Sequence, residues 1–126
     1  MTSTGQPRVL VVEDEGVVLI AFELALAELG FDVAGCASDL ETGLALASSL
    51  TLDIALLDVN LAGRDSGPIA DVLAARAIPF VFASGYTRST LPARHAARPL
   101  LSKPFSDKSL GDALSAALAN AKSPGR

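Results

Sequence analysis

Five short apolar runs recur along the chain at near-regular intervals. They begin at residues 8, 33, 54, 80 and 100, so a new run starts every 20 to 26 residues. In order, the runs are Arg8–Val12, Val33–Cys36, Ile54–Leu57, Phe80–Ala83 and Leu100–Leu101. Short apolar runs that alternate with helical patterns are typical of βα units and of a parallel sheet buried on both faces. The pattern therefore predicts an alternating α/β fold, in which the fifth run is the weakest strand.

Helix start and stop signals lie between these runs. Asp14 is expected to cap a helix that covers Val17–Leu29 and stops at Gly30. The segment Ser38-Asp39-Leu40-Glu41 has the form of a capping box for a second helix. Two further helices are expected to begin at Ser66 and Ser106.

The segment 87–99 differs from the other connections. It contains Pro92 and Pro99, three arginines, a histidine, and Leu91 as its one large aliphatic residue. Because proline interrupts the hydrogen-bond ladder of a helix, a short or mobile fourth helix is expected here. His95 has no second metal ligand nearby in the sequence and is interpreted as solvated. The arginines form either a solvated loop or a docking surface for an acidic partner.

Length and composition are those of one domain. The chain has 126 residues, half of them apolar, and a net charge of −4, so we expect a single domain over 1–126 with a core at about 8–121. The acidic balance argues against nucleic-acid binding. The longest apolar run, Val17–Phe22, is too short for a membrane span, and residues 1–7 carry no secretory signal. The single cysteine, Cys36, excludes an internal disulfide and is interpreted as a small core residue. We expect a cytoplasmic monomer.

Polar side chains follow four of the five predicted strands. They are Glu13, Asp14 and Glu15 after the first, Asp58 after the third, Ser84 after the fourth and Lys103 after the fifth. These side chains should converge, because the carboxyl ends of parallel strands meet at one edge of a sheet. Crowded carboxylates repel one another, and Mg²⁺, which prefers oxygen ligands and phosphate, would relieve that repulsion. An ammonium and a hydroxyl beside them suit a dianionic group, so the set favours phosphoryl transfer to a carboxylate.

Four segments carry a resemblance to a known family. Val9–Glu15, Leu56–Leu61, Ala83–Gly85 and Ser102–Phe105 together resemble, in order and spacing, the receiver domain of two-component response regulators over nearly the whole chain. The resemblance implies a flavodoxin-like (βα)₅ three-layer sandwich with a parallel five-stranded sheet in the order 2-1-3-4-5. It also implies a stand-alone domain in a phosphorelay, which accepts a phosphoryl group from a phosphohistidine donor. Such a domain signals through protein–protein contacts or onward phosphotransfer. It is not an enzyme beyond its own phosphorylation and dephosphorylation.

The resemblance assigns roles to the acidic residues. Asp58 corresponds to the phospho-acceptor, and Glu13 and Asp14 correspond to the acidic pair that binds Mg²⁺ together with it. Asn60 corresponds to the position whose backbone carbonyl is a further metal ligand. The implied donor is a sensor histidine kinase or a histidine phosphotransfer protein. Val17–Phe22 cover more than one helical face, so some apolar area is expected outside the core, and the resemblance implies that the kinase docks on this first helix. The sequence does not identify the downstream partner.

A narrower resemblance lies in the segment Pro79–Tyr86. Its sequence Pro-Phe-Val-Phe-Ala-Ser-Gly-Tyr is similar to the motif of the atypical FAT GUY receivers, with Ser84 where threonine is usual. Ser84 corresponds to the switch hydroxyl, and Lys103 corresponds to the lysine that pairs with the phosphoryl group and precedes a cis proline. Leu100 stands where receivers carry a switch aromatic, so Tyr86 is the candidate to replace that ring.

Two other classes of protein share part of this pattern. Phosphatases of the haloacid-dehalogenase class also use a strand-end aspartate with Mg²⁺ and lysine. They usually require a second acid where this chain has Asn60, and they are seldom as short as 126 residues. A nucleotide- or flavin-binding module needs a glycine-rich phosphate loop after the first strand, where Glu13–Glu15 would repel phosphate. The receiver domain is the interpretation that accounts for all four motifs.

Overall fold

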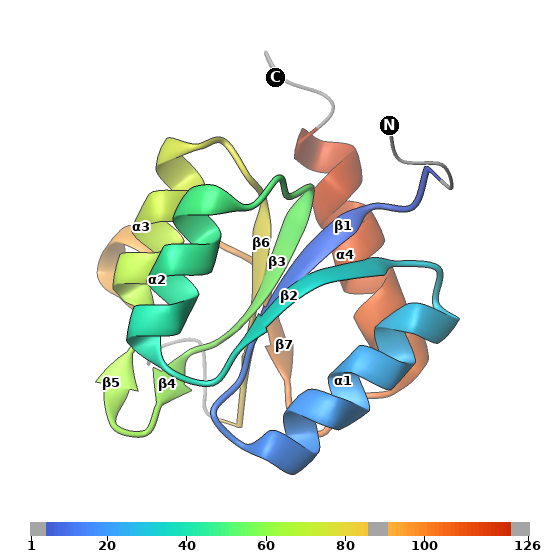
Figure 1. Cartoon of the computed structure of the whole chain (residues 1–126), viewed down its shortest axis with the longest axis horizontal. Helices are drawn as coiled ribbons and strands as arrows, with labels where there is room; N and C mark the ends of the chain where they lie inside the picture. The colour runs from blue at the N-terminus through green and yellow to red at the C-terminus, as the bar shows by residue number, and fades with distance from the viewer. Residues whose placement is uncertain (1–4, 86–90, 122–126) are drawn as a thin grey trace.

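Five parallel strands form the central sheet of the molecule (Figure 1). The computed structural model describes residues 5–85 and 91–121. The strands of the sheet are β1 (Arg8–Val12), β2 (Asp32–Ala37), β3 (Ile54–Asp58), β6 (Phe80–Ser84) and β7 (Leu100–Ser102). Their order is β2-β1-β3-β6-β7, and each neighbouring pair is parallel. In chain order this is 2-1-3-4-5, so the flavodoxin-like sheet expected from the sequence is confirmed.

Helices cover both faces of this sheet, as the three layers of Figure 1 show. They are α1 (Gly16–Glu28), α2 (Leu40–Ser49), α3 (Gly67–Ala75) and α4 (Asp107–Ala121). In β1, Val9 and Val11 belong to the core cluster that contains Phe22 of α1 and Leu114 of α4. Leu10, between them, belongs to the cluster on the opposite face, which contains residues of α2 and α3. Side chains alternate in this way because successive residues of a strand point to opposite faces.

The starts of the helices differ from the sequence expectation in two places. Asp14 does not cap α1; the N-cap position is Glu15, and the Asp14 carboxylate accepts the backbone N–H of Ala62 instead, at 2.9 Å. The cap of α2 is Asp39, one residue later than Ser38, and its carboxylate accepts the Thr42 N–H at 2.7 Å. Gly30 follows the end of α1 with φ of +93°, as its role as a helix stop requires.

The last two helices, α3 and α4, begin directly after the two serines predicted from the sequence. Ser66 occupies the N-cap position of α3, but its buried hydroxyl makes no hydrogen bond, and the Asp65 carboxylate accepts the Gly67 N–H instead. Before α4, the Ser106 hydroxyl accepts the Ser109 N–H at 3.0 Å, as expected of an N-cap serine.

A short hairpin that the sequence did not predict follows β3. Its strands are β4 (Asn60–Leu61) and β5 (Arg64–Asp65), and they pair antiparallel. The two residues between them, Ala62 and Gly63, have φ of +53° and +89°. Positive φ at both central residues is the geometry of a two-residue hairpin turn. The Asn60 side chain closes this turn by accepting the Gly63 N–H at 2.7 Å.

The segment between β6 and β7 has little regular structure where it is described. Its one helical element is a 3₁₀ turn, η2 (Ala93–His95), in agreement with the short fourth helix expected. The expectation that His95 is solvated is wrong: the residue is 6% exposed, and its ring lies 5.5 Å edge-on from Phe80. Burial is tolerated because the ring nitrogen Nε2 has a polar partner, the Asp71 carboxylate at 2.8 Å.

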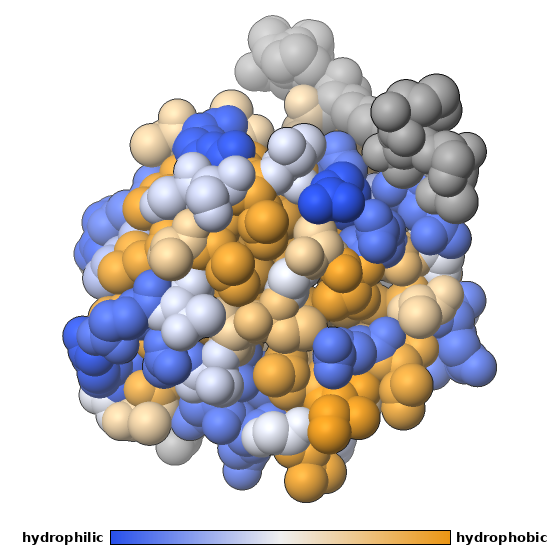
Figure 2. All heavy atoms as spheres, viewed as in Figure 1, coloured by the Kyte–Doolittle hydropathy of each residue, from blue (hydrophilic) through white to orange (hydrophobic). Residues whose placement is uncertain are grey.

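Helix α1 leaves apolar side chains outside the core, as expected from its continuous apolar run. Val17 is 83% exposed, and Ile20 and Leu24 are also exposed on this helix. We call these three residues the α1 patch; Figure 2 shows apolar side chains on the surface over α1. None of the helices in the described part of the chain combines the length and the apolar character that crossing a membrane requires.

Candidate functional site: an acidic cluster with one lysine

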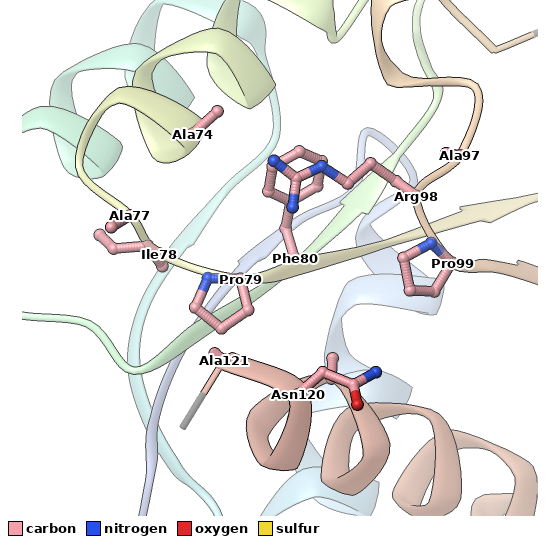
Figure 3. A pocket seen from close by; sticks show the side chains of 11 residues that line it. Ala74, Ala77, Ile78, Pro79, Phe80, Ala97, Arg98, Pro99, Asn120 and Ala121 are labelled. Carbon is pink, nitrogen blue, oxygen red and sulfur yellow. The ribbon is translucent and has the colours of Figure 1, made fainter. Parts of the chain in front are cut away.

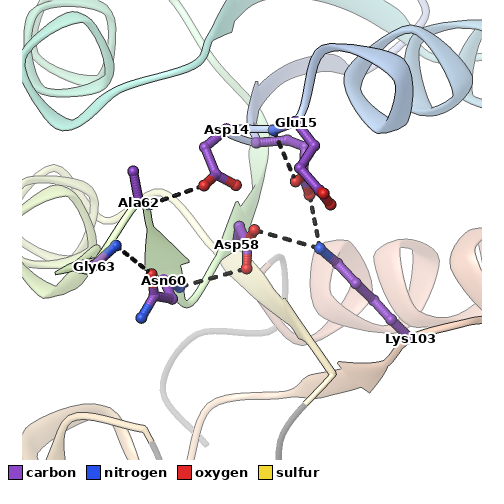
Figure 4. A network of polar contacts seen from close by, with 8 residues as sticks. Asp14, Glu15, Asp58, Asn60, Ala62, Gly63 and Lys103 are labelled. Carbon is purple, nitrogen blue, oxygen red and sulfur yellow. Dashed lines mark hydrogen bonds and ion pairs between the residues drawn. The ribbon is translucent and has the colours of Figure 1, made fainter.

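The polar residues predicted to converge do meet at one edge of the sheet (Figure 4). Glu13 follows β1, Asp58 ends β3, Ser84 ends β6 and Lys103 follows β7. The register explains this meeting, because Asp58 lies opposite Ala83 and Ser84 lies opposite Ser102 in neighbouring strands. This register brings the strand ends to one edge of the sheet, where Lys103 contacts both Glu13 and Asp58 and where Ser84 ends the neighbouring strand.

Lys103 joins two carboxylates from different strands. Its Nζ lies 2.8 Å from Oε1 of Glu13, which is completely buried, and 3.3 Å from Oδ2 of Asp58. Burial lowers the pKa of Lys103, but the hydrogen bond to Glu13 and the charge of Asp58 outweigh this effect and raise the pKa above its ordinary value. The lysine is therefore held in its charged form.

Asp58 sits in a less favourable electrostatic environment. Burial and the charge of Glu13 raise its pKa to about 6, although Lys103 and the Asn60 N–H act in the opposite direction. Near neutral pH the carboxylate is still mostly ionised, and one cation is shared between two anions. This combination leaves the cluster with uncompensated negative charge.

The donor set fits a divalent cation. Glu13, Asp14 and Asp58 each offer a carboxylate oxygen, and these oxygens all lie within 4.8 Å of one another. Oxygen donors of this type suit Mg²⁺, which binds through a few carboxylates and keeps several waters. The cluster could therefore bind a metal ion, which would supply the missing positive charge.

The β4–β5 hairpin lies directly against this cluster. The Asn60 N–H points to Oδ1 of Asp58 at 3.4 Å, and the Ala62 N–H donates to Asp14. Asn60 is thus adjacent to the cluster through its N–H, and the role of its backbone carbonyl as a metal ligand stays a prediction. The role of Ala62 was missed, and alanine gives no sequence signal for it, because the donor is a backbone group.

Of the two predicted switch residues, Ser84 and Tyr86, the structure describes only Ser84. Ser84 is buried at the end of β6, and its carbonyl oxygen accepts the Lys103 N–H at 2.8 Å, which ties the two residues together. Tyr86 lies outside the described residues. Leu100 occupies β7, opposite Phe82. The Lys103–Pro104 peptide is cis, as expected.

Two cavities of similar volume lie on the surface, one beside the acidic cluster and one away from it. One, of about 420 Å³, is lined by Val18 and Phe22 of α1 and by Lys103, Pro104 and Phe105. It joins the α1 surface to the lysine of the cluster. The other, of about 410 Å³, lies at the opposite edge of the sheet, where the Arg98 guanidinium stacks over Phe80 (Figure 3). The acidic cluster contributes no residue to the second cavity.

Known proteins share this fold and part of this sequence. The solution structure of SdrG from Sphingomonas melonis Fr1 is 38% identical, with a TM-score of 0.79 over 90% of this chain and 97% of that one. The receiver domain of the response regulator PhyR from Erythrobacter litoralis is 27% identical, with a TM-score of 0.83 over 97% of both chains. No protein-family model matches the chain.

A curated relative is also similar. The transcriptional regulatory protein PdtaR of Mycobacterium tuberculosis is 30% identical over 115 residues, which are 88% of this chain and 56% of that protein. The chain thus spans about half the length of the curated relatives that it matches. Fold, strand-end residues and these likenesses agree: the chain belongs to the receiver domains of response regulators, which are signalling proteins and not conventional enzymes.

Proposed function

We propose that this chain is a response regulator receiver domain that accepts a phosphoryl group from a phosphohistidine donor on Asp58. The observation that carries the proposal is the position of Asp58, whose ionised carboxylate lies 3.3 Å from the Lys103 ammonium and within 4.8 Å of two further carboxylates. A buried carboxylate between a cation and a cation-binding cluster suits nucleophilic attack on phosphorus.

In the transfer step, an Asp58 oxygen forms a bond to phosphorus as the bond between phosphorus and the donor imidazole nitrogen breaks. The nitrogen keeps the electron pair of that bond. Lys103 contacts Asp58 and is the proposed partner of an equatorial phosphoryl oxygen, while Ser84 is the proposed hydrogen-bond donor to another. Hydrolysis of the aspartyl phosphate by the same site would return the domain to its resting state.

We assign the metal site to Glu13, Asp14 and Asp58, with the Asn60 backbone carbonyl as a further ligand. Bound Mg²⁺ would neutralise charge on the phosphoryl oxygens. A magnesium ion is coordinated in the active-site cleft of the receiver domain of the sensor histidine kinase PA1611 from Pseudomonas aeruginosa PAO1, which has the same fold. In this chain the three carboxylates supply the oxygen donors that such an ion needs.

The donor is proposed to be a sensor histidine kinase or a histidine phosphotransfer protein that docks on the α1 patch. That patch lies on the helix that follows Glu13 and Asp14, and the cavity beside Lys103 begins at Val18 and Phe22 of the same helix. An apolar surface next to the acceptor can hold a donor helix close to Asp58. The domain is proposed to act as a cytoplasmic monomer of the FAT GUY type, with Tyr86 in place of the aromatic absent at Leu100.

Phosphorylation with a labelled small donor tests the proposal. Acetyl phosphate with Mg²⁺ should label the wild-type chain, and Asp58→Asn should abolish the labelling. Asp112→Asn is the matched control: it removes an exposed carboxylate that is paired with Lys108 in α4. That variant should label like the wild type. Labelling that persists in Asp58→Asn would remove the assignment of the acceptor.

A further inference from the structure

One ion-pair cluster outside the acidic site fastens the segment between β6 and β7 to α3. Its centre is Asp71 of α3, whose Oδ1 lies 2.7 Å from Nε of Arg94 and whose Oδ2 lies 2.9 Å from Nη2 of the same guanidinium. Asp71 Oδ1 also lies 2.8 Å from Nε2 of His95. A bidentate arginine pair of this kind fixes both distance and orientation. One carboxylate thus holds two consecutive residues of the segment.

The burial of His95 strengthens this attachment. Its ring packs edge-on against Phe80, and the ring centroid lies 6.3 Å from that of Phe82. The residue therefore packs against β6 and also contacts Asp71 of α3. Leu91, earlier in the same segment, is also buried in the core. Hydrogen bonds from Arg94 and His95 lower the pKa of Asp71 to about 2, which keeps the carboxylate charged.

The same arginine faces the hairpin that borders the acidic cluster. A Cβ added at Gly67 would come within 2.7 Å of Nη2 of Arg94 and 2.8 Å of Oδ1 of Asp65. The guanidinium therefore lies at the start of α3, next to the last residue of β5. At its other end the hairpin is bound to Asp58 through Asn60, and its turn is bound to Asp14 through Ala62.

We propose that the Asp71–Arg94–His95 cluster is a latch that holds the segment 91–98 in its resting position, and that phosphorylation of Asp58 opens it. This rests on the proposed function, of which it is the regulatory step. Here Asp71 is a positioning residue: it touches neither the phosphoryl group nor the metal ion.

Two contacts that change on phosphorylation connect the site to the latch. A phosphoryl group on Asp58 would compete for the carboxylate oxygen that now accepts the Asn60 N–H, so the hairpin loses this contact and Asp65 can shift against Arg94. On the other side, a Ser84 drawn toward the phosphoryl group would pull on the chain that leads to Leu91. Differential contacts of this kind are what a shift between two states requires.

The segment itself offers little resistance to release. The described hydrogen bonds within it are those of a single turn, from the N–H of His95 to Pro92, of Ala96 to Ala93 and of Arg98 to His95. Short elements with few backbone bonds open at low free energy. The described contacts that resist opening therefore include the latch, the buried side chains of Leu91 and His95, and the Arg98 guanidinium over the Phe80 ring.

Nuclear magnetic resonance on the full chain tests this, with beryllofluoride and Mg²⁺ as the phosphoryl mimic. The mimic should shift the signals of Asp58 and Lys103, weaken the hydrogen-bonded Nε–H signal of Arg94, and speed amide exchange at His95 and Ala96 by about tenfold or more. Shifts at Asp58 with an unchanged Arg94 signal and unchanged exchange would overturn the latch and leave the proposed function standing. No shift at Asp58 would overturn both.

The variant Asp71→Asn gives an independent test. Coupling is reciprocal, so a latch that phosphorylation opens must, when weakened, favour phosphorylation. The variant should show the faster exchange at His95 without the mimic, and beryllofluoride with Mg²⁺ should bind to it several-fold more tightly than to the wild type. Asp112→Asn, which removes an exposed ion pair in α4, should change neither. Faster exchange with an unchanged affinity for beryllofluoride would show that the segment is not coupled to Asp58, and would overturn the proposal.

Discussion

The Lys103 ammonium lies 2.8 Å from the completely buried carboxylate of Glu13, a residue 90 positions away in the sequence. Removing the cation leaves that carboxylate buried without its charged partner. We expect Lys103→Met to lower the free energy of unfolding by about 2 to 4 kcal/mol. Urea unfolding of the two proteins measures this difference in the free energy of unfolding. Lys108→Met, which breaks an exposed pair with Asp112, should cost no more than about 0.5 kcal/mol. Equal losses in the two variants would contradict the expectation.

Asp58 should weaken the fold at neutral pH. Its folded-state pKa of about 6 lies above the unfolded value of about 3.9, so its ionisation is harder in the folded protein. The stability that this residue contributes is therefore fully present below about pH 4 and is lost as the pH rises through 6. Without Mg²⁺, Asp58→Asn should raise the free energy of unfolding at pH 7.5 by about 1 to 2 kcal/mol, and by much less at pH 4.5.

The metal ion supplies the control for that prediction. If Mg²⁺ binds among Glu13, Asp14 and Asp58, millimolar MgCl₂ should stabilise the wild type and reduce the advantage of Asp58→Asn. Thermal unfolding with MgCl₂ and with EDTA checks this. Equal stabilisation of both proteins by Mg²⁺ would show that Asp58 is not one of its ligands.

Cys36 should react slowly with alkylating reagents. Burial, together with the hydrogen bond to Glu23 and the charge of that carboxylate, raises the pKa of its thiol to about 12. At pH 8 the thiolate fraction is then roughly a thousandfold below that of an unperturbed cysteine. Iodoacetamide should modify the native protein far more slowly than the urea-unfolded chain. Glu23→Gln should speed the native reaction; an unchanged rate would mean that burial alone protects the thiol.

The α1 patch should matter for a protein donor and not for a small one. Ile20→Ser replaces an exposed apolar side chain, so the free energy of unfolding should change by less than about 0.5 kcal/mol. Phosphotransfer from a histidine kinase should slow at least several-fold, whereas labelling by acetyl phosphate should stay at the wild-type rate. A parallel loss with both donors would place the effect in the site and not in docking.

The sheet and the strand-end residues could be predicted because they rest on short-range patterns. Four of the five apolar runs end at or near an acid, a hydroxyl or a lysine of the site, and parallel strands gather those ends whatever the connections are. Long-range pairings leave no such trace. The partner of His95 is Asp71, 24 residues earlier, and no periodicity links the two. The binding of Asp14 to Ala62 is equally hidden, because the hairpin has two-residue strands and its donor is a main-chain group.

The strand that precedes Lys103 is the last of the five to be synthesised. In a chain that emerges from the ribosome, Glu13, Asp14 and Asp58 are synthesised long before Lys103. Until β7 docks beside β6, Glu13 and Asp58 lack the lysine that pairs with them among the described residues, and closing the core around them would bury unpaired charge. Completion of the sheet is therefore coupled to the arrival of the lysine, and a nascent chain that stops short of it has to leave this edge open to water or to free cations.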